Sequence, residues 1–370
     1  MNQKKIMIIA NDTTYTYNLR NEILERLVSD GYEVVIASHP LLFQNELKAL
    51  GCRLVTMKTK RHSINPFSNL EMLFRYRRIL SEEKPDLVLS YNIKPNVYGG
   101  IVCRLTGTHF LPNITGLGTP VENPGLMQKF SIFLYKTGVA GADCVFFQNE
   151  ENRSFFVEHH MLRKGCPTHM LPGSGVSLKQ HLLIPYPEQD DTIHFLFIAR
   201  ILKEKGIDLY LHAAEQICTK HKNVVFHICG LCDDSHYISR LQEAEKNGFV
   251  IYHGEQKNMA PFFEQAHCIV HPSYYPEGMS NVLLEAAAHG RPIIATNRAG
   301  CRETVDDGKS GYVIPIKDED ALVDALERFL SLSWEQKRDM GLAGRAKIER
   351  EFDRQFVVKA YIEEIEKVLH

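Results

Sequence analysis

The sequence has no apolar run of the roughly 20 residues that a membrane-spanning helix needs. Lys4 and Lys5 precede only the short apolar stretch Ile6–Ala10, so no secretory signal peptide is predicted. The nine cysteines are odd in number and irregularly spaced, which indicates reduced thiols and argues against a disulfide framework. These features predict a cytoplasmic protein that is at most peripheral on the inner face of the cytoplasmic membrane.

The sequence also lacks a strong excess of charge of either sign. The net charge is −2, from 43 Lys+Arg and 45 Asp+Glu. Residues 1–180 carry 21 basic and 15 acidic side chains (+6), and residues 181–370 carry 22 and 30 (−8). The basic half favours an anionic partner, although an imbalance of this size also arises by chance. Without a strong basic face or a recognisable motif, no nucleic-acid partner is expected.

Short apolar strands alternate with helical periods through two halves of the chain, which is too long for one ordinary core. The first series covers residues 1–180 and the second covers residues 181–352, after a Gly- and Pro-rich linker at residues 173–191. The sequence therefore predicts two Rossmann-like, doubly wound parallel-sheet α/β domains with a ligand cleft between them. Residues 353–370 are expected to form a helix that packs back on the N-terminal domain.

The segment Tyr275–Ala286 places two carboxylates, Glu277 and Glu285, eight residues apart. Ser280 or Asn281 is a natural N-cap for the helix that follows. The N–H groups at a helix start favour an anion such as a diphosphate, and flanking carboxylates accept hydrogen bonds from hydroxyls. This combination favours a sugar nucleotide, although an isolated E-x7-E more often marks an ordinary loop and amphipathic helix.

Several segments of the second half resemble the retaining nucleotide-sugar glycosyltransferases of family 4, which have the two-domain GT-B fold. In chain order they are Phe197–Arg200, Lys203–Gly206, Phe226–Gly230, His271–Ser273, the E-x7-E segment, Gly290–Thr296, Gly300–Val305 and Gly311–Val313. The first half is similar more loosely, through Pro85–Asp86, Phe147–Asn149 and Gly173–Val176. Thr115–Gly118 and Ser63–Phe67 resemble bacterial transferases that extend lipid-linked sugars for surface polysaccharides such as O-antigen or capsule.

The resemblance implies roles for residues on the donor side. Arg200 and Lys205 would bind the diphosphate and stabilise its charge as the nucleotide leaves. Glu277 would orient donor sugar hydroxyls and complete the predicted catalytic set. Glu285 would accept hydrogen bonds from the ribose. The other predicted donor-binding residues are Gly278, Met279, Ser280 and Asn281. The backbone N–H groups of the first three would bind oxygens of the donor sugar or of the phosphates.

The acceptor side is predicted from position. Lys94, Thr115 and Gly116 follow strands of the first half, so we expect them at the ligand edge as acceptor contacts. In residues 58–78 basic side chains bracket apolar ones. That pattern suits an anionic membrane surface or a lipid diphosphate, and it is also that of an ordinary amphipathic helix.

Some features depart from the family pattern, and others could indicate a different function. Asn11–Asn18, after the first strand, is expected to be a tyrosine-containing loop where the family has glycines, so no phosphate contact is assigned to it. Ala199 stands where the family commonly has glycine. The acidic run Asp318–Asp320 favours a helix start over a metal site, and Cys229 and Cys232 favour structural over redox roles. No metal and no cofactor are expected.

Together these features predict a retaining, metal-independent glycosyltransferase. It would move a hexose or N-acetylhexosamine from a nucleotide-sugar, with a UDP-sugar as favoured donor, to a polyprenyl-diphosphate-linked glycan. One alternative is a nucleotide-sugar epimerase of similar fold, which would turn over donor without an acceptor. Another is a catalytically silent sugar-nucleotide binding module, against which the joint presence of Arg200, Lys205, Glu277 and Glu285 argues.

Overall fold

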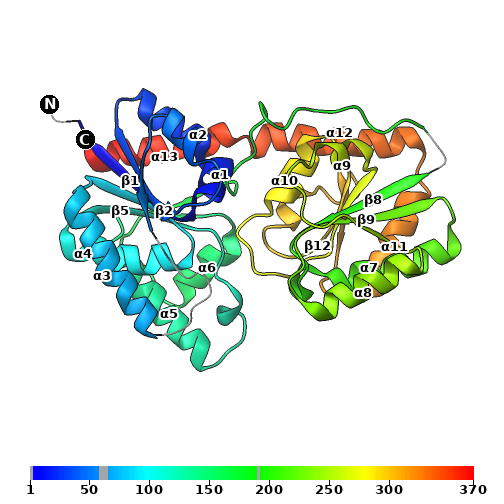
Figure 1. Ribbon diagram of the computed structural model, residues 1–370, viewed down its shortest axis with the longest axis horizontal. Coiled ribbons are helices and arrows are strands. Elements are labelled where there is room, and N and C mark those ends of the chain that lie inside the picture. Colours follow the sequence, from blue (N-terminus) through cyan, green and yellow to red (C-terminus); the bar gives the residue numbers. More distant parts are fainter. Residues whose placement is uncertain (1–2, 58–65, 190–191) are drawn as a thin grey trace. The chain divides into compact units, whose positions relative to one another are not determined.

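The structure, a computed structural model, describes residues 3–57, 66–189 and 192–370. The chain forms two compact units, shown in Figure 1. Unit 1 contains Met1–Gly175, Pro276–Met279 and Arg354–His370, and unit 2 contains Val176–Tyr275 and Ser280–Asp353. Four residues of the E-x7-E segment and the last helix thus belong to unit 1.

Unit 1 has a seven-stranded sheet in which all pairings are parallel. Its order is β3 (Arg53–Thr56), β2 (Glu33–His39), β1 (Lys5–Asp12), β4 (Leu87–Tyr91), β5 (His109–Ile114), β6 (Val145–Phe147) and β7 (Thr168–Met170). Alternate residues of β1 enter different cores: Ile6 and Ile8 pack on one face, and Met7 and Ile9 on the other. Burial on both faces explains why these strands are continuous apolar runs.

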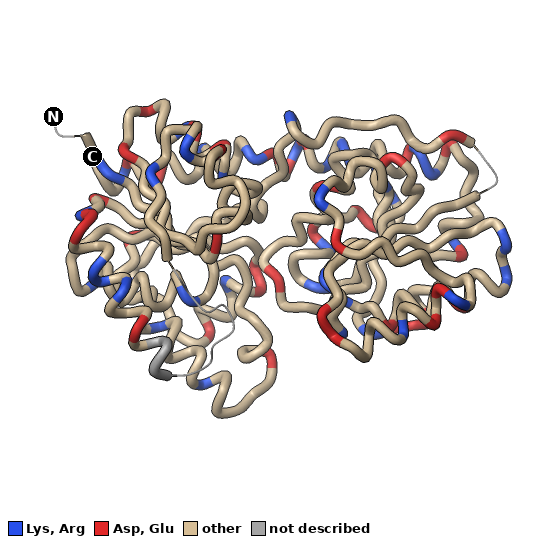
Figure 2. Tube along the Cα trace, in the orientation of Figure 1, with Lys and Arg blue, Asp and Glu red and all other residues tan. Residues whose placement is uncertain are grey.

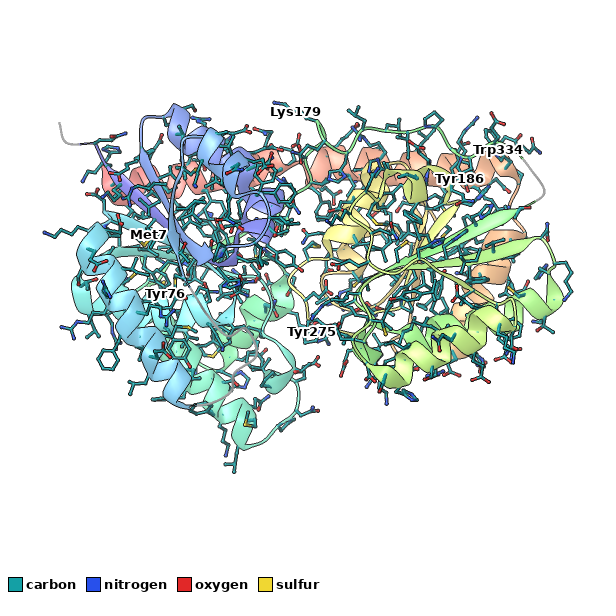
Figure 3. The ribbon with its side chains drawn as sticks, viewed as in Figure 1. Met7, Tyr76, Lys179, Tyr186, Tyr275 and Trp334 are labelled. Carbon is teal, nitrogen blue, oxygen red and sulfur yellow. The ribbon has the colours of Figure 1, made fainter. Side chains whose placement is uncertain are left out.

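Helices cover both faces of this sheet (Figure 1). One core includes side chains from α1 (Thr13–Ser29), α2 (Gln44–Ala49) and α13 (Arg354–Leu369). The other includes side chains from α3 (Pro66–Glu83), α4 (Gly100–Thr106), α5 (Leu126–Val139) and α6 (Glu150–Glu158), with Tyr76 of α3 labelled in Figure 3. Two short turns complete the unit, the π-helical η1 (Pro95–Gly99) and the 3-10 helix η2 (Thr119–Val121).

The first helix begins at Thr13, so the expectation of a loop over Asn11–Asn18 is wrong. Asp12 is the N-cap, and its carboxylate accepts a hydrogen bond from the Tyr15 N–H at 2.9 Å. An aspartate in this position satisfies a free N–H group at the helix start. The tyrosines of this segment therefore lie on a helix, not on a loop.

Unit 2 has a six-stranded, all-parallel sheet. Its order is β10 (Ile251–Tyr252), β9 (Val224–Cys229), β8 (Ile193–Ile198), β11 (Cys268–His271), β12 (Ile293–Thr296) and β13 (Gly311–Ile314). Its helices are η3 (Lys203–Lys205), α7 (Ile207–Lys220), α8 (Ser235–Lys246), α9 (Ala260–Gln265), α10 (Asn281–Ala288), η4 (Arg302–Thr304), α11 (Glu319–Leu330) and α12 (Trp334–Glu351).

The two units confirm the predicted fold class of two doubly wound, parallel-sheet domains. In each sheet the strand order reverses at one point, between β1 and β4 in unit 1 and between β8 and β11 in unit 2. Ligands of such folds bind outside the carboxyl ends of the strands at this switch point. The residues that follow β8, β11, β1 and β4 are therefore the ones to examine for function.

The second part of the predicted linker, residues 184–187, is anchored to unit 2. The fully buried Arg291 donates to the Phe263 and Pro185 carbonyls, each at 2.7 Å. The Trp334 indole donates to the Pro187 carbonyl at 2.8 Å, and its ring centroid lies 6.0 Å from that of Tyr186 (Figure 3). Residues 184–187 are thus a packed strap, while residues 190–191 lie outside the described chain.

Four histidine rings stack across the unit 2 sheet, in the order His267, His194, His227, His253, with centroids 5.7, 5.2 and 5.2 Å apart. His227 shares hydrogen bonds of 2.9 Å with both His194 and His253, and each bond needs one unprotonated ring nitrogen as its acceptor. Burial, with the two neighbouring histidines, lowers the pKa of His227 to about 4. Burial, with the charge of Lys205, lowers the pKa of His271 to about 3.

We expect unit 2 to be acid-sensitive for this reason. A histidine with a lowered folded-state pKa stabilises the fold fully above its unfolded value of about 6.5, and the stability is lost as pH falls toward the folded value. Urea unfolding at pH 7 and at pH 4.5 measures how much the free energy of unfolding falls between the two pH values. In His227→Gln this fall should be smaller by about 2 kcal/mol, because one histidine with a lowered pKa is removed. The exposed His236→Gln is the control, and equal pH dependence in all three proteins would contradict this account.

Candidate donor site

The two residues of unit 2 that are predicted to bind the diphosphate lie together at the carboxyl ends of β8 and β11. Arg200 is exposed two residues after β8, and Lys205 ends the 3-10 turn η3. The Lys205 ammonium lies 5.0 Å from the centroid of the Tyr275 ring, in the segment that follows β11 (Tyr275 is labelled in Figure 3). Both cations therefore lie at the switch point of this sheet.

The electrostatics of this point favour an anion. Burial lowers the pKa of Lys205 to about 8, and the charge of Arg200 contributes to the lowering. Two cations held near each other at a partly desolvated edge repel, and a bound anion relieves that repulsion. A diphosphate at this position would therefore raise the pKa of Lys205 and gain from both side chains.

Gly206 fixes η3 against the exit of β11. Its φ of +82° suits glycine, and an added Cβ would lie 2.2 Å from the Pro272 carbonyl oxygen. The Tyr274 N–H donates to the Glu204 carbonyl at 2.9 Å, which joins the same two segments. The position of Lys205 thus depends on a close backbone contact that admits no side chain.

The helix α10 carries the second half of the motif. Ser280 is its N-cap by position, without a capping bond from its side chain, and Asn281 and Glu285 are half-buried one turn apart on one face. The Asn281 amide oxygen is buried and has no hydrogen-bond donor among the residues that the structure describes. A buried acceptor of this kind is usually satisfied, so it indicates a place for a ligand hydroxyl.

The E-x7-E segment divides between the two units. Glu277, Gly278 and Met279 belong to unit 1, and Ser280, Asn281 and Glu285 to unit 2. Within unit 1 the Asn149 amide donates to the Gly278 carbonyl at 2.6 Å and to the Glu277 carbonyl at 3.1 Å. The spacing of two glutamates in one motif could not reveal this division.

The loop of unit 1 contacts two predicted acceptor residues. The Gly278 N–H donates to the Thr115 carbonyl at 3.0 Å, and a Cβ on Gly116 would lie 3.0 Å from the Pro276 carbonyl oxygen. A Cβ on Gly278 would in turn lie 2.4 Å from Gln148 Oε1. The structure therefore brings Thr115 and Gly116 beside the segment that carries Glu277.

Two backbone N–H groups that are expected to bind the donor already donate hydrogen bonds within the protein. The Gly278 N–H donates to Thr115, and the Ser280 N–H donates to the Gly300 carbonyl at 2.8 Å. A donor oxygen on either group would have to replace a bond that the fold already makes. The donor-binding roles of Gly278 and Ser280 remain predictions that need another basis.

The switch point of unit 1 has an irregular backbone. Asn92, just after β4, has a φ of +76°, and the π-helical turn Pro95–Gly99 follows the half-buried Lys94, whose pKa burial lowers. Buried Asn96 locks the turn: its amide oxygen accepts from Ser90 Oγ at 2.6 Å, and its amide donates to the Asn113 carbonyl at 2.7 Å. Rare turns of this kind are frequent at functional sites.

The sequence motifs did not single out Asn92 and Asn96, and they included Asn149 only as the end of the loosely similar segment Phe147–Asn149. The sequence signal of all three is position, because each follows a strand closely. Two of them, Asn96 and Asn149, act by binding carbonyl groups of distant segments. Such bonds leave no local pattern in the sequence.

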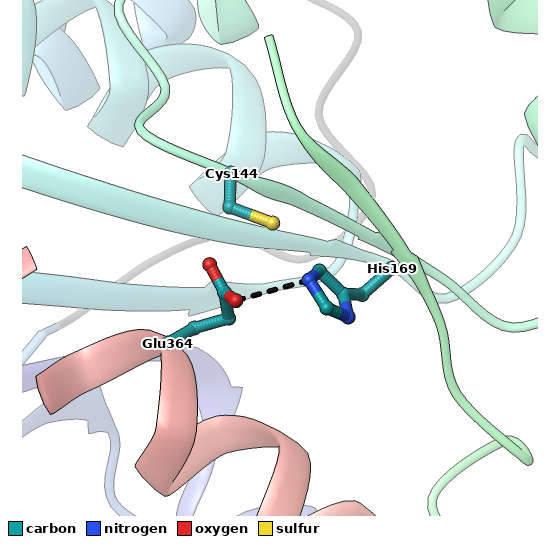
Figure 4. Close-up of side chains that lie close together, drawn as sticks. All are labelled: Cys144, His169 and Glu364. Atoms are coloured by element: carbon teal, nitrogen blue, oxygen red, sulfur yellow. Dashed lines mark ion pairs between the residues drawn. The ribbon is translucent and has the colours of Figure 1, made fainter. Parts of the chain in front are cut away.

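One cluster of possible metal ligands lies away from the donor site, among the residues that the structure describes. The ligand atoms of Cys144, His169 and Glu364 lie within 4.8 Å of one another (Figure 4). Glu364 pairs with His169 at 3.0 Å and with Lys367 at 2.5 Å. Burial, with the nearby Glu364 carboxylate, raises the pKa of Cys144 to about 12, so its thiol is protonated at neutral pH. The cluster therefore acts as a polar contact between α13 and the sheet.

The other competing motifs have structural explanations. Asp318 caps α11, accepting from the Ala321 N–H at 2.9 Å. Cys229 and Cys232 are both free thiols, and burial raises the pKa of Cys229 to about 12, whereas a reactive thiol has a lowered pKa. The expectation that the protein needs no metal or cofactor remains a prediction.

The predicted membrane segment is described in part, because residues 58–65 lie outside the described ranges. Along α3, Leu70 and Phe74 are exposed, as are Arg77 and Arg78. Among the described helices, none is long and apolar enough to cross a membrane.

Comparison with known proteins identifies the family of both halves. Residues 183–347 match the family model of glycosyl transferases group 1, and residues 5–149 match that of the glycosyl transferase 4-like domain. One relative is the N,N'-diacetylbacillosaminyl-diphospho-undecaprenol alpha-1,3-N-acetylgalactosaminyltransferase of Campylobacter jejuni, 24% identical over 99% of both chains. Another is the capsular polysaccharide biosynthesis glycosyltransferase CapM of Staphylococcus aureus, 23% identical over 84% of each.

Solved structures agree with the fold. A glycosyltransferase from Rickettsia africae is similar with a TM-score of 0.79 at 18% identity, covering 100% of this chain and 99% of the other. HepE from Anabaena, solved with UDP and glucose, has a TM-score of 0.78 at 13% identity and covers 99% and 100%. With the two family models matching its two units, the chain belongs to the family 4-like, group 1 glycosyltransferases of the GT-B fold.

Proposed function

We propose that this glycosyltransferase moves a hexose or N-acetylhexosamine from a UDP-sugar to a polyprenyl-diphosphate-linked glycan, with retention at the anomeric carbon. The observation that carries the proposal is the pair of cations, Arg200 and Lys205, at the switch point of unit 2. The family and the resemblance to retaining transferases support it, as does the UDP bound to the structural neighbour HepE.

The reaction needs stabilisation of a leaving diphosphate. Negative charge grows on the nucleotide as the bond from its phosphate oxygen to the anomeric carbon breaks. Fixed positive groups beside that oxygen lower the barrier because they interact more strongly with the transition state than with the ground state. Arg200 and Lys205 are assigned to this task. Because side chains supply the charge, the proposed reaction proceeds without a metal.

The hydroxyl groups of the donor need acceptors. On α10 the Glu285 carboxylate is assigned to the ribose, with the Asn281 amide oxygen beside it as a second acceptor. On unit 1, Glu277 is assigned to hydroxyls of the transferred sugar, and Asn149 holds the backbone of its loop. Met279 completes the loop of proposed donor contacts.

The acceptor assignment rests on relatives and on position. The Campylobacter relative is named for an undecaprenyl-diphosphate-linked acceptor, and the Staphylococcus relative for capsular polysaccharide. The half-buried Lys94 suits a diphosphate, and the basic and apolar residues 58–78 suit an anionic membrane surface. We therefore place the enzyme in the assembly of a surface polysaccharide, working peripherally at the cytoplasmic membrane.

Transfer of labelled sugar from UDP-sugars to polyprenyl-diphosphate-linked saccharides tests the proposal. We expect a labelled lipid product with the donor's anomeric configuration, formed equally with and without a chelator. Donor turnover without acceptor would favour the epimerase, and binding without any turnover would favour the silent module. An inverted product would remove the retaining assignment, and activity that a divalent ion restores after chelation would remove the metal-free one.

The lowered pKa of Lys205 predicts how UDP affinity depends on pH. Because the folded, unliganded protein has a Lys205 pKa of about 8, binding of the diphosphate above that pH must include uptake of a proton. We expect the dissociation constant of UDP to rise toward about tenfold per pH unit above pH 8. Calorimetric titration at pH 7, 8 and 9 measures this. Lys205→Arg should bind UDP with a flatter profile, and a flat profile in the native protein would contradict the assignment.

A further inference from the structure

The first two turns of α5 expose large apolar side chains. Leu126 is 85% exposed, Met127 56%, Phe130 54% and Phe133 62%. Residues 126, 130 and 133 follow the i, i+4, i+7 spacing, so they form one stripe along the helix, with residue 127 beside it. Single exposed apolar residues are ordinary, whereas a contiguous stripe of this size marks an interaction surface.

The other end of α5 is anchored. Tyr135 and Val139 are buried in the core of unit 1, and the Tyr135 ring packs edge-on against Phe156, with centroids 5.4 Å apart. The helix is therefore held firmly by its C-terminal half. Its exposed apolar half is thus part of a packed helix.

The charge along α5 identifies the partner. The helix contains no acidic residue, and its two charged residues, Lys129 and Lys136, are both exposed. Figure 2 shows where basic and acidic residues lie along the chain. Aromatic and aliphatic side chains interleaved with lysines are typical of helices that lie in the interface of an anionic membrane. In a symmetric pair of such helices, like charges would meet, which argues against a second copy of the chain.

A second helix offers the same combination of side chains. The helix α3 packs into the same core of unit 1 as α5, and it exposes Leu70, Phe74, Arg77 and Arg78. Both helices thus cover one face of the same sheet.

We propose that α5 inserts its stripe of Leu126, Met127, Phe130 and Phe133 into the interface of an anionic lipid bilayer. The stripe fixes unit 1 to the membrane surface, and Lys129 and Lys136 contact the lipid phosphates. This membrane contact lies outside residues 58–78, and it stands apart from the sugar chemistry. A protein without transferase activity would still bind vesicles through α5.

Co-sedimentation with vesicles tests the proposal, using phosphatidylcholine alone and with about a third of phosphatidylglycerol. The native protein should bind the anionic vesicles, and Phe130→Ser with Phe133→Ser should weaken that binding by about tenfold or more. The control is Phe356→Ser on α13, whose side chain is 46% exposed and whose helix packs in the core on the opposite face of the sheet. It should bind like the native protein. Lys129→Gln with Lys136→Gln should lose binding to the anionic vesicles selectively.

Two results would overturn the proposal. One is equal vesicle binding by the native protein and the Phe130/Phe133 double variant, with the same melting temperature in both. The other is a native dimer in light scattering that the double variant abolishes, together with no vesicle binding. Because the readout is vesicle binding, failure here is distinguishable from failure of the proposed reaction.

Discussion

Replacing Arg200 by alanine is expected to lower the turnover number by at least about a hundredfold. Arg200 is exposed at the end of β8, so the change removes no core contact and the melting temperature should stay close to that of the native protein. The loss should appear mainly in kcat, because the guanidinium interacts most strongly with charge that develops in the transition state. Steady-state kinetics at saturating donor measure it.

Lys203→Ala is the matched control for Arg200. Lys203 is an exposed cation in the neighbouring turn η3, so its loss changes the local charge equally. We expect the turnover number of Lys203→Ala to remain within a few-fold of the native value, since Lys203 has no assigned contact with the diphosphate and an exposed charge is largely screened by salt. Near-normal turnover of Arg200→Ala would remove Arg200 from the mechanism.

Replacing Gly206 by alanine is expected to be strongly destabilising and to abolish tight UDP binding. The new Cβ would lie 2.2 Å from the Pro272 carbonyl oxygen, so the turn η3 or the exit of β11 has to move. The positive φ of +82° adds a backbone cost of about 1 kcal/mol, and the clash should add roughly 2 kcal/mol or more. Movement of η3 would displace Lys205. Urea unfolding and UDP titration measure the two effects.

Gly248→Ala separates backbone strain from the clash. Gly248 has a similar φ of +76°, but nothing lies within 4 Å of an added Cβ. We expect a cost of about 1 kcal/mol and unchanged UDP affinity. If the two alanine variants had equal stabilities, the close contact between Gly206 and Pro272 would not support the site.

The sheets could be predicted well because their strands are buried on both faces. The apolar runs Leu87–Tyr91, His109–Ile114, Val224–Cys229 and Cys268–His271 each lie between polar turns and are predicted as buried strands. They are the strands β4, β5, β9 and β11 of the structure, with the same bounds. The positions of Arg200 and Lys205 followed from the same pattern, because residues after a parallel strand lie at the ligand edge of the sheet. The positions of the motif residues in unit 2 could therefore be predicted from the sequence.

The failures have two causes. The three-residue β7 and the nine-residue α6 were not predicted because elements of this length show little hydrophobic periodicity. The assignment of Pro276–Met279 to unit 1 depends on the Asn149 amide and the Thr115 carbonyl, which no spacing within the motif encodes. The hydrogen bonds that the Gly278 and Ser280 N–H groups donate within the protein could not be predicted for the same reason.

The start of α1 is a different kind of error. The family pattern of glycines suggested a loop after β1, whereas the residues themselves contain a helix N-cap at Asp12. The local chemistry of aspartate, which satisfies a free N–H group, determines the structure at this point. An aspartate at this position predicts the helix start without the family pattern.

Titration of UDP into the purified protein, beside Glu285→Ala, tests the central claim most directly. The account predicts that UDP binds selectively over GDP and ADP, and that Glu285→Ala binds it at least about tenfold more weakly, because one charge-assisted hydrogen bond to the ribose is lost. Equal affinity in the two proteins would show that the ribose lies elsewhere. A native protein that binds no nucleotide at all would contradict the donor site itself.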